Sequence, residues 1–216
     1  MNIMVVVCLF VAIIFSTVLH ELAHGWTAYL LGDTTAKEEG RLSLNPLRHI
    51  DPVMSLVLPI MLYLMGMPIL GGAKPVPIDS RRLKGGAWGM ALVAIMGPLT
   101  NFLLAFLVFG IGVATHAFIL QGGNWYVAGE MGVILNQIVL MELGFFLFNI
   151  IPIPPLDGSR VLYAISPDVV RDFLRRVEPY GIMVVYGLLV FLSGVFSRYM
   201  SGAMEGIIQF FWFIFG

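Results

Sequence analysis

Long apolar segments separated by short polar connections dominate the pattern of this 216-residue chain. A helix needs about twenty mainly apolar residues to cross the hydrocarbon core of a bilayer. The longer segments meet that requirement, so the pattern predicts an all-α polytopic membrane protein with a single domain over residues 1–216. The apolar segments are Ile3–Leu31, Val53–Met67, Ala87–Leu120, Glu130–Ile151, Pro179–Phe196 and Ile207–Phe215.

The second and the last of these segments are too short to cross a bilayer on their own. Val53–Met67 contains Pro59 and is followed directly by Pro68, which favours a re-entrant or interfacial segment whose backbone is covered by protein. The tail Ile207–Gly216 is predicted to lie at the interface or to pack on the bundle, unless its helix extends back through Glu205. We therefore expect about four to five spanning helices plus one re-entrant segment.

Composition supports a membrane protein and argues against one class of partner. Apolar residues make up 59% of the chain and charged residues 12%, compared with about half and about a quarter in soluble proteins. The sequence has no stripe of basic and aromatic residues of the kind that binds nucleic acid. Membrane lipid is therefore an expected partner and nucleic acid is not.

The distribution of Lys and Arg indicates which connections share a side. If every segment crosses, eight basic residues lie on one side and four lie on the other, namely Lys37, Arg41, Arg48 and Arg198. If Val53–Met67 enters and returns, the ratio becomes eleven to one, with only Arg198 on the poorer side. Because cytoplasmic connections carry an excess of Lys and Arg, this favours the re-entrant segment. It also places Gly71–Gly86, predicted as a short extended hairpin or loop, on the cytoplasmic side.

The most informative feature is the run His20-Glu21-Leu22-Ala23-His24 inside the first apolar segment. Ionisable groups at membrane depth are costly and usually mark a functional site. Two histidines four residues apart share one face of a helix, so both can offer a ring nitrogen to one Zn²⁺. Glu21 is close enough to activate water there. The alternative is a pair of structural histidines, which would require all three groups to be paired off within the bilayer.

A catalytic zinc of this type needs a third protein ligand, and the chain offers His49, Asp51, His116 and Asp157. His116 lies near the opposite end of its helix and is the poorest choice. Asp157 is favoured because three prolines stiffen the segment before it and Gly158 permits a tight turn after it. With Val53–Met67 re-entrant, the end of the first helix and the end of the helix before Asp157 also face the same side.

Four motifs give the chain a resemblance to the site-2 protease family of intramembrane zinc metalloproteases, in its compact prokaryotic form without a PDZ or CBS domain. The resemblance covers about Val18 to Arg160. The motifs are His20-Glu21-x-x-His24, Asn45-Pro46-x-x-His49-x-Asp51-Pro52, Gly97-Pro98-Leu99-Thr100-Asn101 and the proline-rich run from Asn149 to Gly158.

The resemblance implies a ligand set and a catalytic base. His20, His24 and Asp157 would hold one Zn²⁺ per chain. Glu21 would act as the general base that activates water and then passes the proton to the leaving amine. Asn149 would orient the substrate or stabilise the oxyanion.

The resemblance also implies how a substrate is bound. Asn101 would line the same site, and the extended segment Gly72–Ile78 would pair edge-on with an unwound stretch of a transmembrane helix. Gly97-Pro98 would kink or thin its helix and permit close packing. The expected function is hydrolysis of peptide bonds in or near transmembrane helices of membrane proteins. The expected location is a prokaryotic cell membrane, with the zinc site toward the cytoplasm.

Two other functions are compatible with the same residues. A metal-ion transporter would use His and Glu as a transit site, and it predicts ligands on both sides of the midplane. An inactive relative would bind helices without cutting them, and it predicts an altered Glu21 or Asp157, whereas both are intact.

Overall fold

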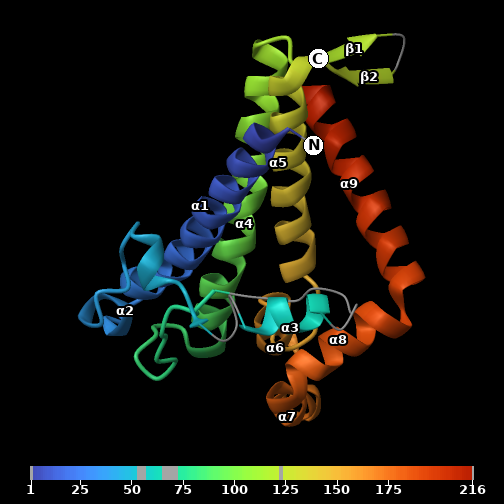
Figure 1. The fold of residues 1–216 in the computed structure, drawn as a ribbon. Helices are drawn as coiled ribbons and strands as arrows, with labels where there is room; N and C mark the ends of the chain where they lie inside the picture. The colour runs from blue at the N-terminus through green and yellow to red at the C-terminus, as the bar shows by residue number, and fades with distance from the viewer. Residues whose placement is uncertain (1, 53–56, 65–72, 122–123, 216) are drawn as a thin grey trace.

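The computed structural model describes residues 2–52, 57–64, 73–121 and 124–215. Within them the chain is mainly helical, with one pair of short strands (Figure 1). The elements in chain order are α1 (Ile3–Leu30), α2 (Thr35–Glu38), η1 (Pro46–Arg48), α3 (Leu58–Leu64), α4 (Gly86–Ala114), β1 (Phe118–Gln121), β2 (Asn124–Val127), α5 (Gly129–Asn149), α6 (Gly158–Ile165), α7 (Asp168–Val177), η3 (Glu178–Tyr180), α8 (Gly181–Phe191) and α9 (Ser193–Phe215).

Three long helices, α1, α4 and α5, form the centre of the molecule, and each is long and apolar enough to cross a membrane. Helix α4 packs against both α1 and α5 (Figure 1). The starts of α1 and α5 lie together, since Asn2 Nδ2 donates to Glu130 Oε1 at 3.0 Å. The chain therefore passes down α1, up α4 and down α5 in the view of Figure 1. This arrangement confirms the predicted all-α polytopic membrane fold.

The C-terminal part differs from the expected division into a crossing segment and a short tail. The predicted segment Pro179–Phe196 is interrupted, because α8 ends at Phe191 and α9 begins at Ser193. The parts Asp168–Phe191 and Ser193–Phe215 are bent by 88°, and together they add at most one span to the three long helices. Ser193 and Gly194 are weak helix formers, which fits a break at this point.

The tail Ile207–Gly216 is correspondingly not an isolated interfacial piece. Its described residues form the second half of α9, which runs back beside the bundle toward the end where the C-terminus lies (Figure 1). The single charge of Glu205 does not interrupt the helix, because an exposed charged side chain leaves the backbone hydrogen bonds intact. The helix thus extends back through Glu205, and the tail packs on the bundle as one of the predicted alternatives.

The strand pair lies at the opposite end of the molecule from the connection where a hairpin was expected. Strand β1 pairs antiparallel with β2, beside the end of α4 and the start of α5. Within the described residues 73–86 no strand is formed. Pro75 and Pro77 have no backbone N–H to contribute to a ladder, which explains why this connection is extended but unpaired. Of the predicted re-entrant segment, the structure describes α3, which at about 10 Å is too short to cross.

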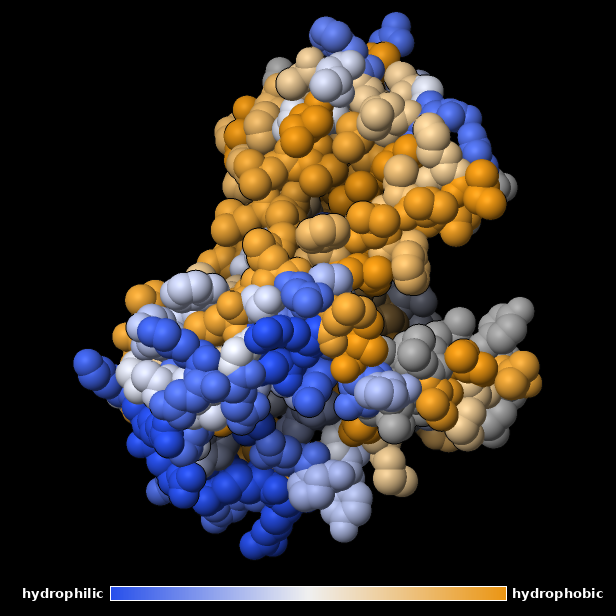
Figure 2. Space-filling model, turned by 60° about the vertical axis from the view of Figure 1, so that its left-hand side comes forward, coloured by the Kyte–Doolittle hydropathy of each residue, from blue (hydrophilic) through white to orange (hydrophobic). Residues whose placement is uncertain are grey.

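A cluster of aromatic side chains fixes the second half of α9 against α4 and α5. Phe211 is fully buried, and the centroid of its ring lies 5.2–5.5 Å from the ring centroids of Phe102, Phe106 and Phe109 in α4. Apolar side chains cover this half of the molecule, whereas polar ones gather at the other end (Figure 2). The functional residues therefore have to be sought where α1 leaves the apolar half and α5 ends.

Candidate metal centre

The two histidines of α1 meet Asp157 at the polar end of the bundle. His20 Nε2 and His24 Nε2 are 3.1 Å apart. Asp157 Oδ2 lies 3.3 Å from the first and 3.4 Å from the second. One side-chain atom from each of the three residues thus points at a common centre, and all three atoms lie within 4.8 Å of one another.

These separations fit a zinc ion. Zn²⁺ binds His nitrogen and carboxylate oxygen at about 2.0–2.2 Å with tetrahedral geometry, which places neighbouring ligand atoms about 3.3 Å apart. The three measured edges of 3.1, 3.3 and 3.4 Å agree with that value. Three protein ligands also leave the fourth tetrahedral position open, as catalytic zinc sites do.

The other ring nitrogens of both histidines are held by acceptors on α4. His20 Nδ1 is 2.6 Å from Asn101 Oδ1, and His24 Nδ1 is 2.8 Å from the carbonyl oxygen of Val93. A carbonyl oxygen only accepts, so each Nδ1 must carry the hydrogen and donate it. Each Nε2 is then left with its lone pair facing the centre, which is the tautomer that binds a metal through Nε2.

Gly97 of α4 lets the helix pass directly beside the two rings. A Cβ atom at this position would lie 2.3 Å from His24 Nε2 and 2.7 Å from His20 Nε2. No side chain fits in that space. The motif Gly97-Pro98, which suggested close helix packing, thus provides room for the two ligand rings, and Pro98 lies inside α4 next to them.

Asp157 reaches the histidines because the chain folds tightly between α5 and α6. Hydrogen bonds from Leu156 N–H to the Ile153 carbonyl and from Ser159 N–H to the Leu156 carbonyl form successive turns. Gly158 follows Asp157 and starts α6, where a Cβ would lie 2.1 Å from the carbonyl oxygen of Ile150. The prolines prevent α5 from continuing, and Gly158 allows the backbone to pass close to the end of α5.

Glu21 is held by the extended segment that precedes α4. Val76 N–H donates to Glu21 Oε2 at 2.8 Å. The peptide group that supplies this N–H is fixed from its other side, since the carbonyl oxygen of Pro75 accepts from Arg41 Nη2 at 3.3 Å. Arg41 Nη2 also donates to the carbonyl of Lys74 at 2.8 Å. Buried Arg41 thus orients the peptide whose N–H contacts the carboxylate.

His49 belongs to the same loop structure, and its ring is hydrogen-bonded within that loop. Its ring nitrogen Nε2 is 2.8 Å from the carbonyl oxygen of Ser43, and the residue is 3% exposed. Its own carbonyl oxygen accepts from Lys74 N–H at 2.8 Å. The structure therefore places His49 as a support of the loop and the extended segment, while Asp157 is the candidate that joins the histidines.

The carboxylate of Asp33 anchors the far end of this extended segment, and the carboxylate of Asp79 accepts hydrogen bonds from Arg81 at the same place. Asp33 Oδ2 accepts from Asp79 N–H at 2.7 Å. Burial acts to raise the pKa of Asp33, but hydrogen bonds from Thr35 and from Asp79 outweigh it and lower that pKa. Hydrogen bonds from the Arg81 side chain and backbone lower the pKa of Asp79 to about 2. Both groups are therefore ionised at neutral pH, and the anchor is intact there.

The remaining predicted residues lie in different places. Asn101 is fully buried and contacts His20 through its side chain. Asn149 Nδ2 donates to the carbonyl of Phe145 in its own helix at 3.1 Å, so its catalytic role stays a prediction. Gly72 lies outside the described residues. His116 lies just past the end of α4 with φ of 56°, at the end away from the cluster (Figure 1).

Sequence reasoning missed Glu142, a carboxylate in the middle of α5 that is 3% exposed. It accepts hydrogen bonds from Ser16 and Asn101. The sequence does indicate Glu142, because an ionisable residue within an apolar, membrane-length segment usually marks a functional site. The same reasoning identified His20 and His24.

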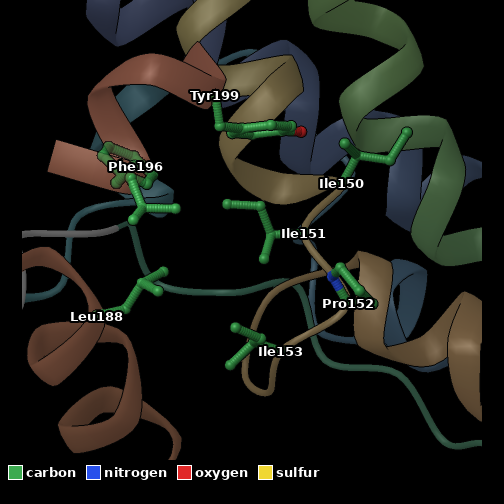
Figure 3. A pocket seen from close by; sticks show the side chains of 8 residues that line it. Ile150, Ile151, Pro152, Ile153, Leu188, Phe196 and Tyr199 are labelled. Carbon is green, nitrogen blue, oxygen red and sulfur yellow. The ribbon is translucent and has the colours of Figure 1, made fainter. Parts of the chain in front are cut away.

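An apolar pocket lies beside the segment that carries Asp157 (Figure 3). Ile151 and Ile153 come from that segment, and Leu188 of α8 and Phe196 of α9 face them across the pocket. Tyr199 of α9 closes one side, with its hydroxyl 3.4 Å from the carbonyl of Leu147. The bend between α8 and α9 therefore lies apart from the C-terminal end of α5, and apolar side chains line the space between them.

Comparison with known proteins agrees with a metal centre of this kind. The chain is 36% identical over 213 residues to a protein named "Putative zinc metalloprotease YwhC" from Bacillus subtilis, with 96% of this chain and 92% of that protein covered. It is 31% identical over 177 residues to "Putative zinc metalloprotease Rip2" from Mycolicibacterium smegmatis, covering 81% of this chain and 63% of the relative. A protein with the Rip2 name from Mycobacterium tuberculosis is 28% identical over 199 residues, covering 88% and 68%.

No family model matches the chain, and no solved structure matches it. The similarity to the Bacillus protein nevertheless extends over nearly the full length of both chains. The chain belongs to the family of zinc metalloproteases that includes YwhC.

Proposed function

We propose that this protein is an intramembrane zinc metalloprotease of the site-2 protease type, which cuts peptide bonds in or near transmembrane helices. The observation that carries the proposal is the convergence of His20, His24 and Asp157 at metal-binding distances, with Glu21 beside them. Two of these ligands and Glu21 lie in α1, a helix apolar enough to cross a membrane. The sequence motifs shared with that family support the same reaction.

The chemistry divides between the metal and the side chains around it. A bound Zn²⁺ supplies Lewis-acid polarisation of the scissile carbonyl and makes water more acidic. Glu21 accepts the proton from the attacking water and later delivers it to the leaving amine. Val76 N–H holds Oε2 of this carboxylate, so we assign Oε1 as the atom that takes the proton. Asn149 is proposed to orient the substrate.

The extended segment and the apolar pocket support a substrate that is an unwound transmembrane helix. A peptide bond can be cut only where the backbone is accessible, and an extended segment such as 73–79 is proposed to pair with such a backbone. The pairing would use mainly free carbonyl groups of the segment, because Pro75 and Pro77 have no N–H and Val76 N–H is bonded to Glu21. Apolar side chains flanking the cut bond would pack in the pocket formed by Ile151, Ile153 and Phe196 (Figure 3). Both features lie beside residues of the metal site.

The direct test uses purified protein and transmembrane-helix peptides. Zinc-loaded protein in detergent or liposomes should cut such peptides within or at the edge of the apolar stretch. A chelator should stop cleavage, and added Zn²⁺ should restore it, as measured by mass spectrometry of the products. Polar peptides of equal length serve as the control and should remain uncut. Transport of metal into protein-containing liposomes without any cleavage would favour a transporter instead.

The distribution of basic residues supports a cytoplasmic location for the metal site. Between Lys84 and Arg160 the chain has no Lys or Arg, and the far end of the bundle, with β1 and β2, lies within that range. Arg198 was expected on the side opposite the other eleven. Because α9 begins next to α8, Arg198 lies in the part of α9 nearest the basic end (Figure 1). All twelve basic residues therefore lie toward one end, as the positive-inside rule requires of a cytoplasmic face.

Cysteine labelling in cells tests this orientation. In a chain with Cys8 replaced by serine, cysteines introduced at positions 45 and 80 should be protected from an impermeant reagent added outside. A cysteine at position 124, in the strand pair, should react with it. Permeabilised cells provide the control, because all three positions should then react. Labelling of 45 and 80 from opposite faces would contradict the proposed topology.

A further inference from the structure

We infer that Glu142 is a positioning residue of the metal site, which acts through the side-chain amide of Asn101 to set the hydrogen-bonding state of His20. The inference rests on the proposed metal site and adds a residue that makes no contact with the metal or the substrate. It assigns a purpose to a carboxylate buried in a membrane-length helix, where an unpaired acidic group is costly.

Glu142 forms a closed set of hydrogen bonds with two other helices. Its Oε2 accepts from Ser16 Oγ of α1 at 2.8 Å and from Asn101 Nδ2 of α4 at 2.7 Å. Asn101 Nδ2 also donates to Ser16 Oγ at 2.9 Å. An amide nitrogen carries two hydrogens, so both hydrogens of Asn101 have acceptors in this set. All three residues are buried.

This arrangement determines which way the Asn101 amide faces. With its nitrogen turned toward Glu142 and Ser16, its oxygen must face the opposite way, and Oδ1 lies 2.6 Å from His20 Nδ1. That oxygen can only accept, so Nδ1 of His20 carries the hydrogen and Nε2 keeps its lone pair. Without the carboxylate the amide is free to turn over. An amide nitrogen facing Nδ1 would favour hydrogen on Nε2, the form that cannot bind metal through that atom.

The effect is comparable to that of carboxylates that hold metal-binding histidines in other proteins. Such a partner fixes the ring orientation and tautomer of the ligand, and its loss typically weakens metal binding by about 10–100-fold. The difference here is that an amide stands between the carboxylate and the ring. Glu142 therefore supplies one oxygen atom, held in a fixed position, that accepts the hydrogen bond from the Asn101 amide. The side-chain oxygen of a glutamine can do the same.

The experiment compares Glu142→Met with Glu142→Gln in the full-length protein. Methionine keeps the length of the side chain but provides no comparable acceptor, so the affinity for Co²⁺, used as a spectroscopic probe of the zinc site, should fall by about 10–100-fold. The visible absorption spectrum of the bound ion should also change, because the His20 ring is less well held. Glutamine can place an oxygen where Oε2 lies, so its affinity and spectrum should stay close to those of the parent.

Leu143→Ala is the matched control, because Leu143 adjoins Glu142 in α5, is fully buried and belongs to the apolar core. This variant loses packing but should bind Co²⁺ with parental affinity and spectrum. Equal affinity and spectrum in Glu142→Met and the parent would overturn the role of Glu142 while leaving the metal site intact. A Glu142→Gln protein as defective as Glu142→Met would overturn it too. A parent that binds no Co²⁺ or Zn²⁺ would overturn both the inference and the proposed function.

Discussion

Replacing Glu21 with glutamine should leave metal binding intact and reduce peptide cleavage by several orders of magnitude. His20, His24 and Asp157 complete the ligand set without Glu21, whose Oε2 is bonded to Val76 N–H. Glutamine keeps the shape of the side chain but cannot take a proton from water. General-base assistance alone is worth about 10²–10⁴-fold, and proton delivery to the leaving amine is lost with it. The measurement is the single-turnover cleavage rate of zinc-loaded protein with a transmembrane peptide.

Glu39→Gln is a suitable control for this comparison, because Glu39 is exposed and lies outside the site. It should cut at the parental rate. The metal content of each variant has to be measured on the same sample. A zinc-loaded Glu21→Gln protein that still cuts at a rate near that of the parent would exclude Glu21 as the base.

Gly97→Ala should abolish metal binding although Gly97 is not a ligand. The added methyl group would lie 2.3 Å from His24 Nε2 and 2.7 Å from His20 Nε2, within the space of the ligand cluster. The rings cannot easily withdraw, because Val93 and Asn101 hold their Nδ1 atoms. We expect no detectable Zn²⁺ under conditions that saturate the parent, as measured by metal analysis after gel filtration, and hence no cleavage.

Gly144→Ala provides the matched control for a glycine in a membrane-length helix. A Cβ there would meet only the end of Met204 at 3.6 Å, which is an ordinary contact. This variant should bind metal and cut peptide like the parent. His24→Ala sets the level expected for loss of a ligand. A Gly97→Ala protein that retains one Zn²⁺ per chain would show that the metal lies elsewhere.

The residues of the candidate metal site could be brought together from sequence because their signals are local. His20 and His24 are four residues apart, and Asp157 follows a run of prolines, so both features are visible without knowledge of the tertiary contacts. Counting helix crossings also predicted that the end of α1 and the segment that carries Asp157 lie on the same side of the membrane. That count assumed an uninterrupted crossing by Pro179–Phe196, whereas the structure bends the chain between α8 and α9. This segment comes after Asp157, so the difference does not affect the pairing.

Other parts of the site depend on contacts between segments that no local pattern encodes. The hydrogen bond from Val76 to Glu21 requires Arg41 and His49 to place the extended segment, and nothing in the sequence around either residue indicates that contact. The continuity of α9 likewise depends on tertiary packing. Its aromatic residues contact α4 and α5, which stabilises a helix that the sequence divides at Glu205.

The convergence of α1 and the segment after α5 on one centre has a thermodynamic consequence for the whole protein. A metal held by His20, His24 and Asp157 is a cross-link between distant parts of the chain. Binding that occurs only in the native state stabilises that state by about 2.7 kcal/mol when the free ligand exceeds its dissociation constant 100-fold. The ion that performs the chemistry would thereby also keep the bundle closed, and the supply of zinc would set both the activity and the lifetime of the folded protein.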